Sequence, residues 1–362
     1  MSSPLVFEHR PNPAPTSDAQ REQVLAAPGF GRHFTDHMAR ATWTAQDGWH
    51  DARVEPYGPL QLDPSAAVLH YAQEIFEGMK VYRWEDGSVR SFRPRANAQR
   101  LARSARRLAL PELGEDDFVE SVRALVEADA AWVPSGGETS LYLRPFMFAS
   151  ESFLGVRAAQ RVDYLVIASP AGSYFSGGVR PVSIWLSRTY TRAGFGGMGA
   201  AKTGGNYAAS LVAQQEAAEH GCEQVCFLDA AEQRYVEELG GMNIFFVHAD
   251  GTLVTPELTG TILEGITRDS VLALATELGL RPVERRVSVD EWKAGVASGE
   301  ITEVFACGTA AVVTPIGALL DGDERVATAE VTDGVAARIR TALLDVQRGR
   351  AADPHGWMHR LV

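Results

Sequence analysis

The sequence predicts a two-domain α/β protein, and three observations point to that fold class. The chain has 362 residues, which corresponds to about two domains of ordinary size. Apolar residues make up 45% of the chain and charged residues 22%, as in globular proteins with a dry core. Between residues 170 and 178 the chain becomes rich in Gly and Ser, and predicted strands and helices alternate beyond that point.

The first half is expected to form a small N-terminal α/β domain over residues 1–170. Residues 1–29 contain five prolines and no sustained apolar run, which predicts a loose arm and no cleaved signal peptide. An apolar stretch at 68–82 is followed by a hairpin turn at 85–87 and a strand at 89–92. Apolar spacing predicts helices at 97–108 and 116–132, with Arg100 away from the apolar face of the first. Strands are expected at 140–148 and 162–168.

Residues 171–183 are predicted to link this domain to a larger C-terminal domain, 184–362. Strands are expected at 182–186 and 224–228, separated by a helix at 207–220. A hairpin of 243–247 and 253–255 turns around Asp250-Gly251. A helix at 268–278 ends before Gly279. An apolar stretch at 303–313 is interrupted by Gly308-Thr309, and the last helix is expected at 335–347.

Charge and cysteine content exclude several classes of function. The formal net charge is -12, so phosphate backbones and anionic membranes are repelled at long range. No apolar run is long enough to span a bilayer. The chain has three cysteines, too few for a disulfide framework. Cys222 and Cys226 have no histidine at ligand spacing and are expected to be reduced core thiols, so no metal site is predicted. A cytoplasmic protein that binds neither nucleic acid nor membrane is expected.

The most unusual local composition surrounds one lysine, Lys202. Six of the fourteen residues from 194 to 207 are glycine, which favours positive φ or close approach of the backbone to a ligand. A phosphate-binding P-loop fits poorly, because Ala201 stands where that loop needs glycine and Gly204-Gly205 should break the helix that follows. A mobile loop with an exposed lysine would also fit. The third interpretation is a lysine that forms a Schiff base with a carbonyl cofactor.

Several motifs in one order resemble the branched-chain-amino-acid aminotransferases of the pyridoxal 5′-phosphate-dependent fold-type IV class. The resemblance runs from about Phe30 to Trp357-Met358. It implies two α/β domains with the cofactor in the interdomain cleft. It also implies transfer of the amino group of L-leucine, L-isoleucine or L-valine to 2-oxoglutarate, giving branched-chain 2-oxo acids and L-glutamate. The motifs are Lys202–Tyr207, His70-Tyr71 with Phe76–Lys80, Phe92–Pro94, Ser140–Pro145, Glu238–Phe245 and Cys307–Ala310.

The resemblance assigns cofactor roles to seven residues. Lys202 would form the Schiff base with pyridoxal phosphate and move the proton between Cα of the amino acid and C4′. Glu238 would hold the proton on the pyridine nitrogen. Without the resemblance, a glutamate beside Glu237 would be expected at the surface, because acidic side chains are mostly exposed. Tyr207 would donate to the ring oxygen. The phosphate would be held by Arg93, by Thr309 and by the backbone N–H groups of Ile266 and Thr267, expected just before the helix at 268–278.

The substrate roles follow in the same way. Gly241 and Ala310 would offer backbone N–H groups to the α-carboxylate, supported by Tyr142. Independently of the resemblance, a buried distal carboxylate of glutamate needs a cationic or hydroxylic partner. Arg144, two residues beyond Tyr142 on a predicted strand, should lie on the same side as it and bind this carboxylate; an interface or core-edge arginine paired with an acid is the alternative. The apolar pocket would be formed by Phe30 and Phe76 and, from the partner subunit of a homodimer with shared active sites, by Tyr71, Leu154 and Val156.

Other functions remain open at this point. D-Amino-acid aminotransferases and aminodeoxychorismate lyases share the fold type, but they lack the full Phe-Glu-Gly-Met-Lys and Tyr-x-Arg set. A P-loop nucleotide hydrolase and a phosphate-binding protein without catalytic activity are the alternatives from other classes. One departure from mammalian members is plain: Ala311 and Thr314 stand where those proteins carry Cys-x-x-Cys, so no thiol switch of that kind is expected.

Overall fold

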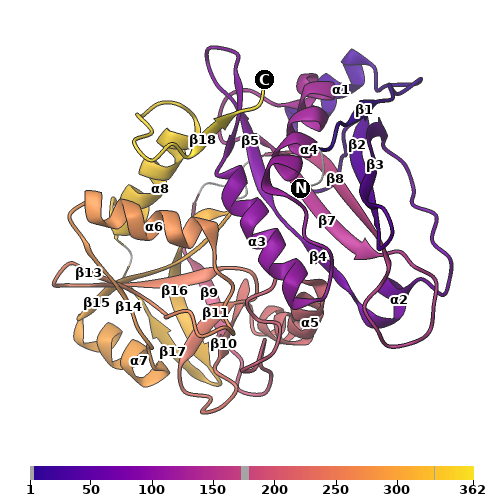
Figure 1. The fold of residues 1–362 in the computed structure, drawn as a ribbon. Helices are drawn as coiled ribbons and strands as arrows, with labels where there is room; N and C mark the ends of the chain where they lie inside the picture. Colours follow the sequence, from indigo (N-terminus) through magenta and orange to yellow (C-terminus); the bar gives the residue numbers. More distant parts are fainter. Residues whose placement is uncertain (1–3, 173–178, 330) are drawn as a thin grey trace. The chain divides into compact units, whose positions relative to one another are not determined.

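The computed structural model describes residues 4–172, 179–329 and 331–362. These residues form two compact units (Figure 1). The first unit contains the described residues of 1–176 together with 201–204 and 346–362. The second contains those of 177–200 and 205–345. Among the described residues, no helix has the length and apolar character needed to cross a membrane.

The first unit is built on one sheet with the strand order β1-β3-β2-β8-β7-β5-β6-β18, to which β4 adds by pairing with β7. Neighbouring strands are antiparallel except for β1 and β3. The strands are β1 (Glu8–His9), β2 (His37–Thr44), β3 (Gly48–Pro56), β4 (Glu74–Phe76), β5 (Met79–Arg83), β6 (Val89–Phe92), β7 (Ser140–Ala149), β8 (Arg161–Ala171) and β18 (Met358–Arg360). The helices are α1 (Asp18–Ala26), α2 (Ala67–Tyr71), α3 (Pro94–Arg107) and α4 (Glu115–Ala128), followed by a 3-10 turn at Ala130–Trp132.

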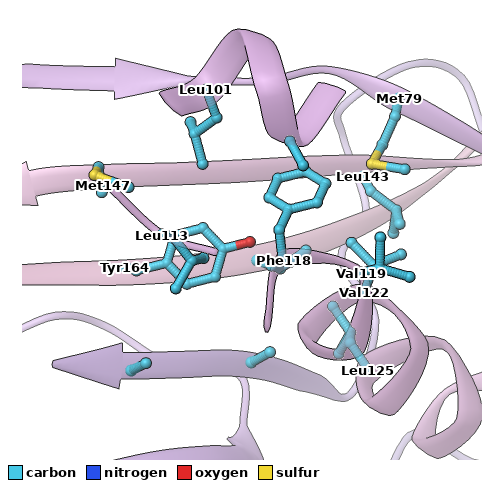
Figure 2. Close-up of a cluster of buried hydrophobic side chains, with 14 of the residues drawn as sticks. Met79, Leu101, Leu113, Phe118, Val119, Val122, Leu125, Leu143, Met147 and Tyr164 are labelled. Atoms are coloured by element: carbon cyan, nitrogen blue, oxygen red, sulfur yellow. The ribbon is translucent and has the colours of Figure 1, made fainter. Parts of the chain in front are cut away.

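The core of this unit lies between the sheet and helices α3 and α4. Figure 2 shows side chains from both helices and from the strands meeting in one cluster around Phe118. Phe118, Val122 and Leu125 are spaced for one face of α4, and all are fully buried. Each such side chain contributes about 1.5–3 kcal/mol on burial. The Tyr164 hydroxyl within this core lies 2.9 Å from Ser121 Oγ, so its polar atom is paired.

The second unit has a mixed sheet with the order β11-β10-β9-β16-β15-β12-β13-β14, and β17 pairs with β16. Strand β9 is parallel to both of its neighbours, and β15 is antiparallel to both of its own. The strands are β9 (Val182–Leu186), β10 (Gln224–Leu228), β11 (Val236–Leu239), β12 (Asn243–His248), β13 (Thr252–Thr255), β14 (Arg281–Glu284), β15 (Ile301–Gly308), β16 (Val312–Asp321) and β17 (Glu324–Ala327). The helices are α5 (Gly204–Glu219), α6 (Ile266–Glu277), α7 (Val289–Ser298) and α8 (Val335–Gln347), with Gly204 and the end of α8 counted in the first unit.

The predicted elements are present, and their ends differ where local chemistry outweighs the apolar pattern. The strands at 182–186 and 224–228 and the helix at 335–347 are confirmed at both ends. Helix α3 begins earlier than predicted, because Pro94 suits the first turn, where its missing N–H is no loss. The predicted helix 116–132 ends as an α-helix at Ala128 and continues only as the 3-10 turn.

The N-terminal arm does not stay loose. Strand β1 pairs with β3, and Phe7 is buried in the core of the first unit. Helix α1 is capped by Ser17, whose Oγ accepts from the N–H of Gln20. The prolines argued against a helix or strand in this segment, but Phe7 and the contacts of Asn12 and Thr16 with residues 36–37 hold it against the first unit.

The domain boundaries predicted from the sequence differ from the boundaries of the two compact units at two places. Pro170 and Ala171 belong to β8, where they pair with Leu141 and Ser140; residues 173–178 of the predicted linker lie outside the described residues. Residues 346–362 belong with the first unit, because β18 forms an antiparallel pair with β6. The boundaries at 171 and 183 therefore stay a prediction.

Candidate active site

The backbone of Lys202 is held by contacts within the first unit. Its N–H donates to Ser104 Oγ of α3 at 2.9 Å. Its carbonyl accepts from the N–H of Phe76, at the end of β4, also at 2.9 Å. The Lys202 Nζ lies 4.8 Å from the centre of the Phe76 ring. Lys202 is therefore fixed beside an aromatic ring and is not an exposed lysine on a mobile loop.

The environment of the Lys202 amine favours its neutral form. The residue keeps some exposed surface, but protein surrounds the ammonium group. Burial, followed by the positive charge of Arg100, lowers the pKa of Lys202 to about 8, while Glu77 acts in the opposite direction. At pH 7 about one tenth of the amine is then unprotonated, far more than for an ordinary lysine, and a nucleophilic lysine needs this neutral form.

Arg100 lies inside the protein, contrary to the prediction that it faces away from the core. It is 4% exposed and donates through Nε and Nη2 to both oxygens of the fully buried Glu77, at 2.8 and 2.7 Å. Asn97 Nδ2 donates to the same carboxylate at 2.7 Å. Paired in this way, two charges can remain buried. The signal in the sequence was the spacing of Asn97, Arg100 and Ser104, which places three polar residues on one face of α3.

The chain turns into helix α5 directly after this lysine, at Gly204. The expectation that Gly204-Gly205 would break a helix here is wrong. Glycine is unfavourable in the middle of a helix, but the first turn tolerates it. A Cβ on Gly204 would overlap the Glu74 carboxylate, so this glycine reflects close packing. The argument against a P-loop from a broken helix therefore fails, and only the mismatch at Ala201 remains.

Arg93 stands at the start of α3 in a left-handed conformation, with φ of 50°. Such a backbone is unusual for a non-glycine residue and is often found at functional sites. Its N–H donates to the carbonyl of Trp357 at 2.7 Å, and its guanidinium carbon lies 5.4 Å from the centre of the Trp357 ring. The C-terminal segment thus fixes the direction of Arg93.

Four of the predicted substrate residues lie together in the first unit. Arg144 Nη2 donates to the Tyr142 hydroxyl at 3.3 Å, which confirms that the two side chains share one side of β7. The Arg144 guanidinium carbon is 4.7 Å from the centre of the Phe76 ring, and Phe30 packs edge-on against Tyr142 at 5.0 Å. Among the described residues, Arg144 Nε is buried without a hydrogen-bond partner.

The other three predicted pocket residues form a separate group on the surface of the same unit. The Tyr71 hydroxyl donates to the carbonyl of Leu154 at 2.6 Å. Leu154 is 69% and Val156 90% exposed. Large apolar side chains exposed to this degree in one place are typical of a surface that meets another molecule.

In the second unit, Glu238 is a buried acid on β11. It is 2% exposed, and its Oε1 lies 2.7 Å from Arg192 Nη1 and accepts from the N–H of Leu263 at 2.8 Å. The surface position that composition suggested is therefore wrong. The neighbouring Glu237 is also buried, bonded to the Thr261 hydroxyl, and burial raises its pKa. Arg192 had no signal in the sequence, because its partner lies 46 positions further along the chain.

Two of the residues predicted to bind the phosphate lie at the start of helix α6. Ile266 and Thr267 form the first turn of α6 and do not precede it. The loop before them is held by Asn243, whose Nδ2 donates to the carbonyl of Leu263 at 3.0 Å. N–H groups in the first turn of a helix have no acceptor within that helix, so this end favours an anion.

Two turns approach each other near this helix. The first, between β11 and β12, contains Gly241; the second, between β15 and β16, contains Thr309 and Ala310. Strands β12 and β15 pair at Asn243 and Cys307, and a Cβ on Gly308 would lie 3.2 Å from Met242 Cγ. Tyr207 Cε1 is 3.8 Å from the position of a Cβ on Gly241. The backbone N–H groups of both turns and the Tyr207 side chain therefore belong to one region of the second unit.

The described part of the chain gives little support for a metal site or a cysteine nucleophile. No group of three or more His, Cys, Asp or Glu side chains there could hold a metal ion. All three cysteines are buried and free. Burial raises the pKa of Cys226 and of Cys307 to about 12, so neither is a nucleophile near neutral pH.

Comparisons with known proteins agree on one family. The model of the amino-transferase class IV family matches residues 74–319. A branched-chain-amino-acid aminotransferase of Mycolicibacterium smegmatis is 59% identical over 365 residues, which covers 99% of each chain. The crystal structure of the Escherichia coli branched-chain amino acid aminotransferase has a TM-score of 0.73 and 28% identity over 90% of this chain and 100% of that one. The branched-chain amino acid aminotransferase from Thermobaculum terrenum, solved in its PLP-bound holo form, has a TM-score of 0.72 and 26% identity, over 89% and 98%.

Proposed function

Because the chain belongs to the amino-transferase class IV family, whose members use pyridoxal 5′-phosphate, we propose that it transfers the amino group of L-leucine, L-isoleucine or L-valine to 2-oxoglutarate. The single observation that carries the proposal is Lys202, a lysine with a lowered pKa, fixed by its backbone beside Phe76. The branched-chain-amino-acid aminotransferases to which the chain is similar support the choice of substrates.

The residues present fit this cofactor by their chemistry. When bound, pyridoxal phosphate supplies an aldehyde for amino groups and a ring that accepts electrons. Lys202 offers an amine that is partly neutral near pH 7, as attachment to an aldehyde requires. Glu238 offers a buried carboxylate to the ring nitrogen, and Tyr207 a phenol to the ring oxygen. Arg93, Thr309 and the first turn of α6, with Ile266 and Thr267, are the groups proposed for the phosphate.

Lys202 would also move the proton of the reaction. In its neutral form it removes the proton from Cα of the amino acid, and as an ammonium group it returns one at C4′ of the cofactor. A pKa of about 8 suits both roles near neutral pH, because neither form is rare. Glu238, held by Arg192 and by the Leu263 N–H, keeps the proton on the ring nitrogen.

The substrate must be held by its carboxylate and by its side chain. The N–H groups of Gly241 and Ala310, supported by Tyr142, are proposed for the α-carboxylate. Phe30 and Phe76 would line the apolar pocket. The other pocket residues, Tyr71, Leu154 and Val156, are proposed to reach the active site of a second copy in a homodimer, which their exposure at the surface of the first unit supports.

One pocket must accept both leucine and glutamate, because the two half-reactions share it. Burial of an unpaired carboxylate is costly, so a cation is needed when glutamate binds. Arg144 fits this role: its Nε has no hydrogen-bond partner among the described residues, and its guanidinium lies close to the rings of Phe76 and Tyr142. When leucine binds, the two aromatic rings keep the cation favourably placed.

A panel of amino donors tests this function. With 2-oxoglutarate as acceptor, L-leucine, L-isoleucine and L-valine should each give L-glutamate, and L-aspartate and D-alanine should be poor donors. Activity with D-alanine and none with the branched-chain donors would favour a D-amino-acid aminotransferase instead. Lyase activity on aminodeoxychorismate, or ATP hydrolysis, would favour the remaining alternatives. A cytoplasmic location, proposed from the acidic composition and the free cysteines, can be checked by cell fractionation.

A further inference from the structure

A partly buried acid, Glu74, contacts the chain just after Lys202 and has no part in the reaction described above. It lies on β4. One of its oxygens, Oε1, accepts from the backbone N–H of Gly204 and, at 3.4 Å, from the Thr203 hydroxyl. The same strand binds the lysine itself two residues later, where the Phe76 N–H donates to the Lys202 carbonyl at 2.9 Å.

These donors partly offset the loss of water around the Glu74 carboxylate. Loss of water contact raises the pKa of Glu74, whereas the Gly204 N–H, the Thr203 hydroxyl and the charge of Arg144 all act to lower it. Gly204 is the first residue of α5, and the first N–H groups of a helix are the ones that favour a negative charge. These donors offset part of the cost of desolvation, and the pKa of Glu74 stays above its usual value.

Gly204 has no side chain, and the Glu74 carboxylate occupies the space beside its Cα. The φ of Gly204 is not in the left-handed region, so its backbone conformation does not require glycine. A Cβ at this position would instead overlap the Oε1 atom of Glu74. Glycine leaves room for this close approach, and a methyl group at residue 204 would push the end of the Glu74 side chain aside.

We propose that Glu74 is a positioning residue for Lys202. Its carboxylate holds Thr203 and Gly204, the Phe76 N–H holds the Lys202 carbonyl, and the Ser104 hydroxyl holds the Lys202 N–H, so the chain is fixed on both sides of the lysine. The amine then keeps its place beside the Phe76 ring, away from water. The inference rests on the proposed role of Lys202, but it can be tested without the reaction.

Backbone hydrogen exchange in the cofactor-free protein is the first test. Glu74→Ala should speed exchange of the Gly204 amide by at least tenfold, because its acceptor is gone, while amides of α4 are unchanged. Glu74→Gln keeps an acceptor oxygen and should give a smaller increase. Glu120→Gln, a surface acid of the same unit that pairs with Arg123, is the matched control and should have no effect. Equal exchange of Gly204 in wild type and Glu74→Ala would overturn the proposal.

The reactivity of the amine is the second test. The chain has only three lysines, Lys80, Lys202 and Lys293, so acetylation by dilute acetic anhydride can be followed for each by peptide mass spectrometry. In the cofactor-free wild type, the pH midpoint for Lys202 should be near 8. Glu74→Ala should raise that midpoint, because a loosened segment exposes the ammonium group to water, and leave the other two lysines unchanged. An unchanged midpoint for Lys202 would count against the proposal.

The single variant Gly204→Ala covers the case in which Glu74→Ala folds poorly, and a double-mutant cycle of the two residues tests whether they act on each other. Gly204→Ala should lower the melting temperature and speed exchange at residue 204 in the otherwise wild-type protein, because its methyl group displaces Glu74. In the Glu74→Ala background the same change should have little effect. Additive effects would show that the two residues are independent. Whether borohydride fixes the cofactor on Lys202 tests the proposed function separately, so failure of one idea is distinguishable from failure of the other.

Discussion

Arg192 Nη1 lies 2.7 Å from Oε1 of Glu238, and both side chains are almost completely buried in the second unit. Arg192 also donates to the carbonyls of Gly199 and Thr261, at 3.3 and 3.1 Å. The position of Arg192 is therefore fixed by the glycine-rich run and by the loop before α6, and its positive charge lies against the Glu238 carboxylate. A carboxylate held in this way fits the role proposed for Glu238 at the pyridine nitrogen of the cofactor.

Glu238→Gln should keep the fold and the cofactor and lose about a hundredfold in turnover, as expected when a preorganised charge is removed. The amide cannot hold the ring proton as a carboxylate does. Single-turnover rates with L-leucine measure the effect. Glu237→Gln is the matched control, since this neighbour is also buried but is bonded to Thr261. A larger loss in Glu237→Gln than in Glu238→Gln would reverse the assignment.

Removal of the Arg100 charge should raise the pKa of Lys202. Arg100 lowers this pKa and Glu77 raises it. Loss of Arg100 alone would leave Glu77 buried without its partner, which typically costs about 3–5 kcal/mol of stability. The Arg100→Met, Glu77→Gln double variant avoids the unpaired charge.

In this double variant the Lys202 pKa should change little, because two opposing effects are lost together. In the single Arg100→Met variant it should rise clearly above about 8. The pH dependence of Lys202 acetylation in the cofactor-free protein measures both. A single variant with the wild-type midpoint would show that burial alone sets the pKa.

The stability of the cofactor-free protein should depend on pH through Lys202. The folded-state pKa is about 8 and the ordinary value is 10.5, so the unfolded chain binds the proton more tightly. Below about pH 8 both states are protonated, and the buried ammonium group lowers the free energy of unfolding by roughly 3 kcal/mol. This penalty disappears as the pH rises from about 8 to 10.5.

Lys202→Met has no such charge and should be more stable than wild type at pH 7. The difference in the free energy of unfolding should shrink as the pH approaches 10. Urea unfolding of both proteins at several pH values gives this difference directly. A constant difference across that range would mean that the amine is not desolvated in the folded protein.

Arg144→Leu should weaken glutamate and 2-oxoglutarate much more than leucine and its 2-oxo acid. The removed guanidinium is the partner proposed for the distal carboxylate, and an unpaired buried carboxylate costs several kcal/mol. Half-reaction kinetics with each donor measure the two losses separately. Arg123→Leu, which removes a surface arginine of the same unit paired with Glu120 and Glu127, should affect neither donor. Equal losses for both donors in Arg144→Leu would make Arg144 a structural residue.

The sequence was a good guide to elements set by apolar spacing. The helix at 335–347 and the strands at 182–186 and 224–228 need only their own residues to define them, and all three are confirmed. The side-by-side placement of Tyr142 and Arg144 also follows from the alternation of side chains along a strand. These predictions depend on local geometry alone.

Pairs joined by tertiary structure could not be found from the sequence. Arg100 was placed on the outside of α3, because nothing local reveals that Glu77 lies inside and pairs with it. Gly204 was expected to break a helix, because the Glu74 carboxylate that its N–H contacts is 130 positions away. Charged residues in the interior are stabilised by distant partners, and periodicity carries no information about these.

The most direct test of the account is the position of the covalent link to the cofactor. The purified protein should be yellow, and borohydride should fix the pyridoxyl group on a single lysine. Only Lys80, Lys202 and Lys293 can receive it, and Lys293 is already bound to Asp321 and Glu324, which raise its pKa. Mass spectrometry of the reduced protein should place the added mass on the peptide that contains Lys202, and Lys202→Ala should lose both colour and transamination. An adduct on Lys80 or Lys293 would contradict the account.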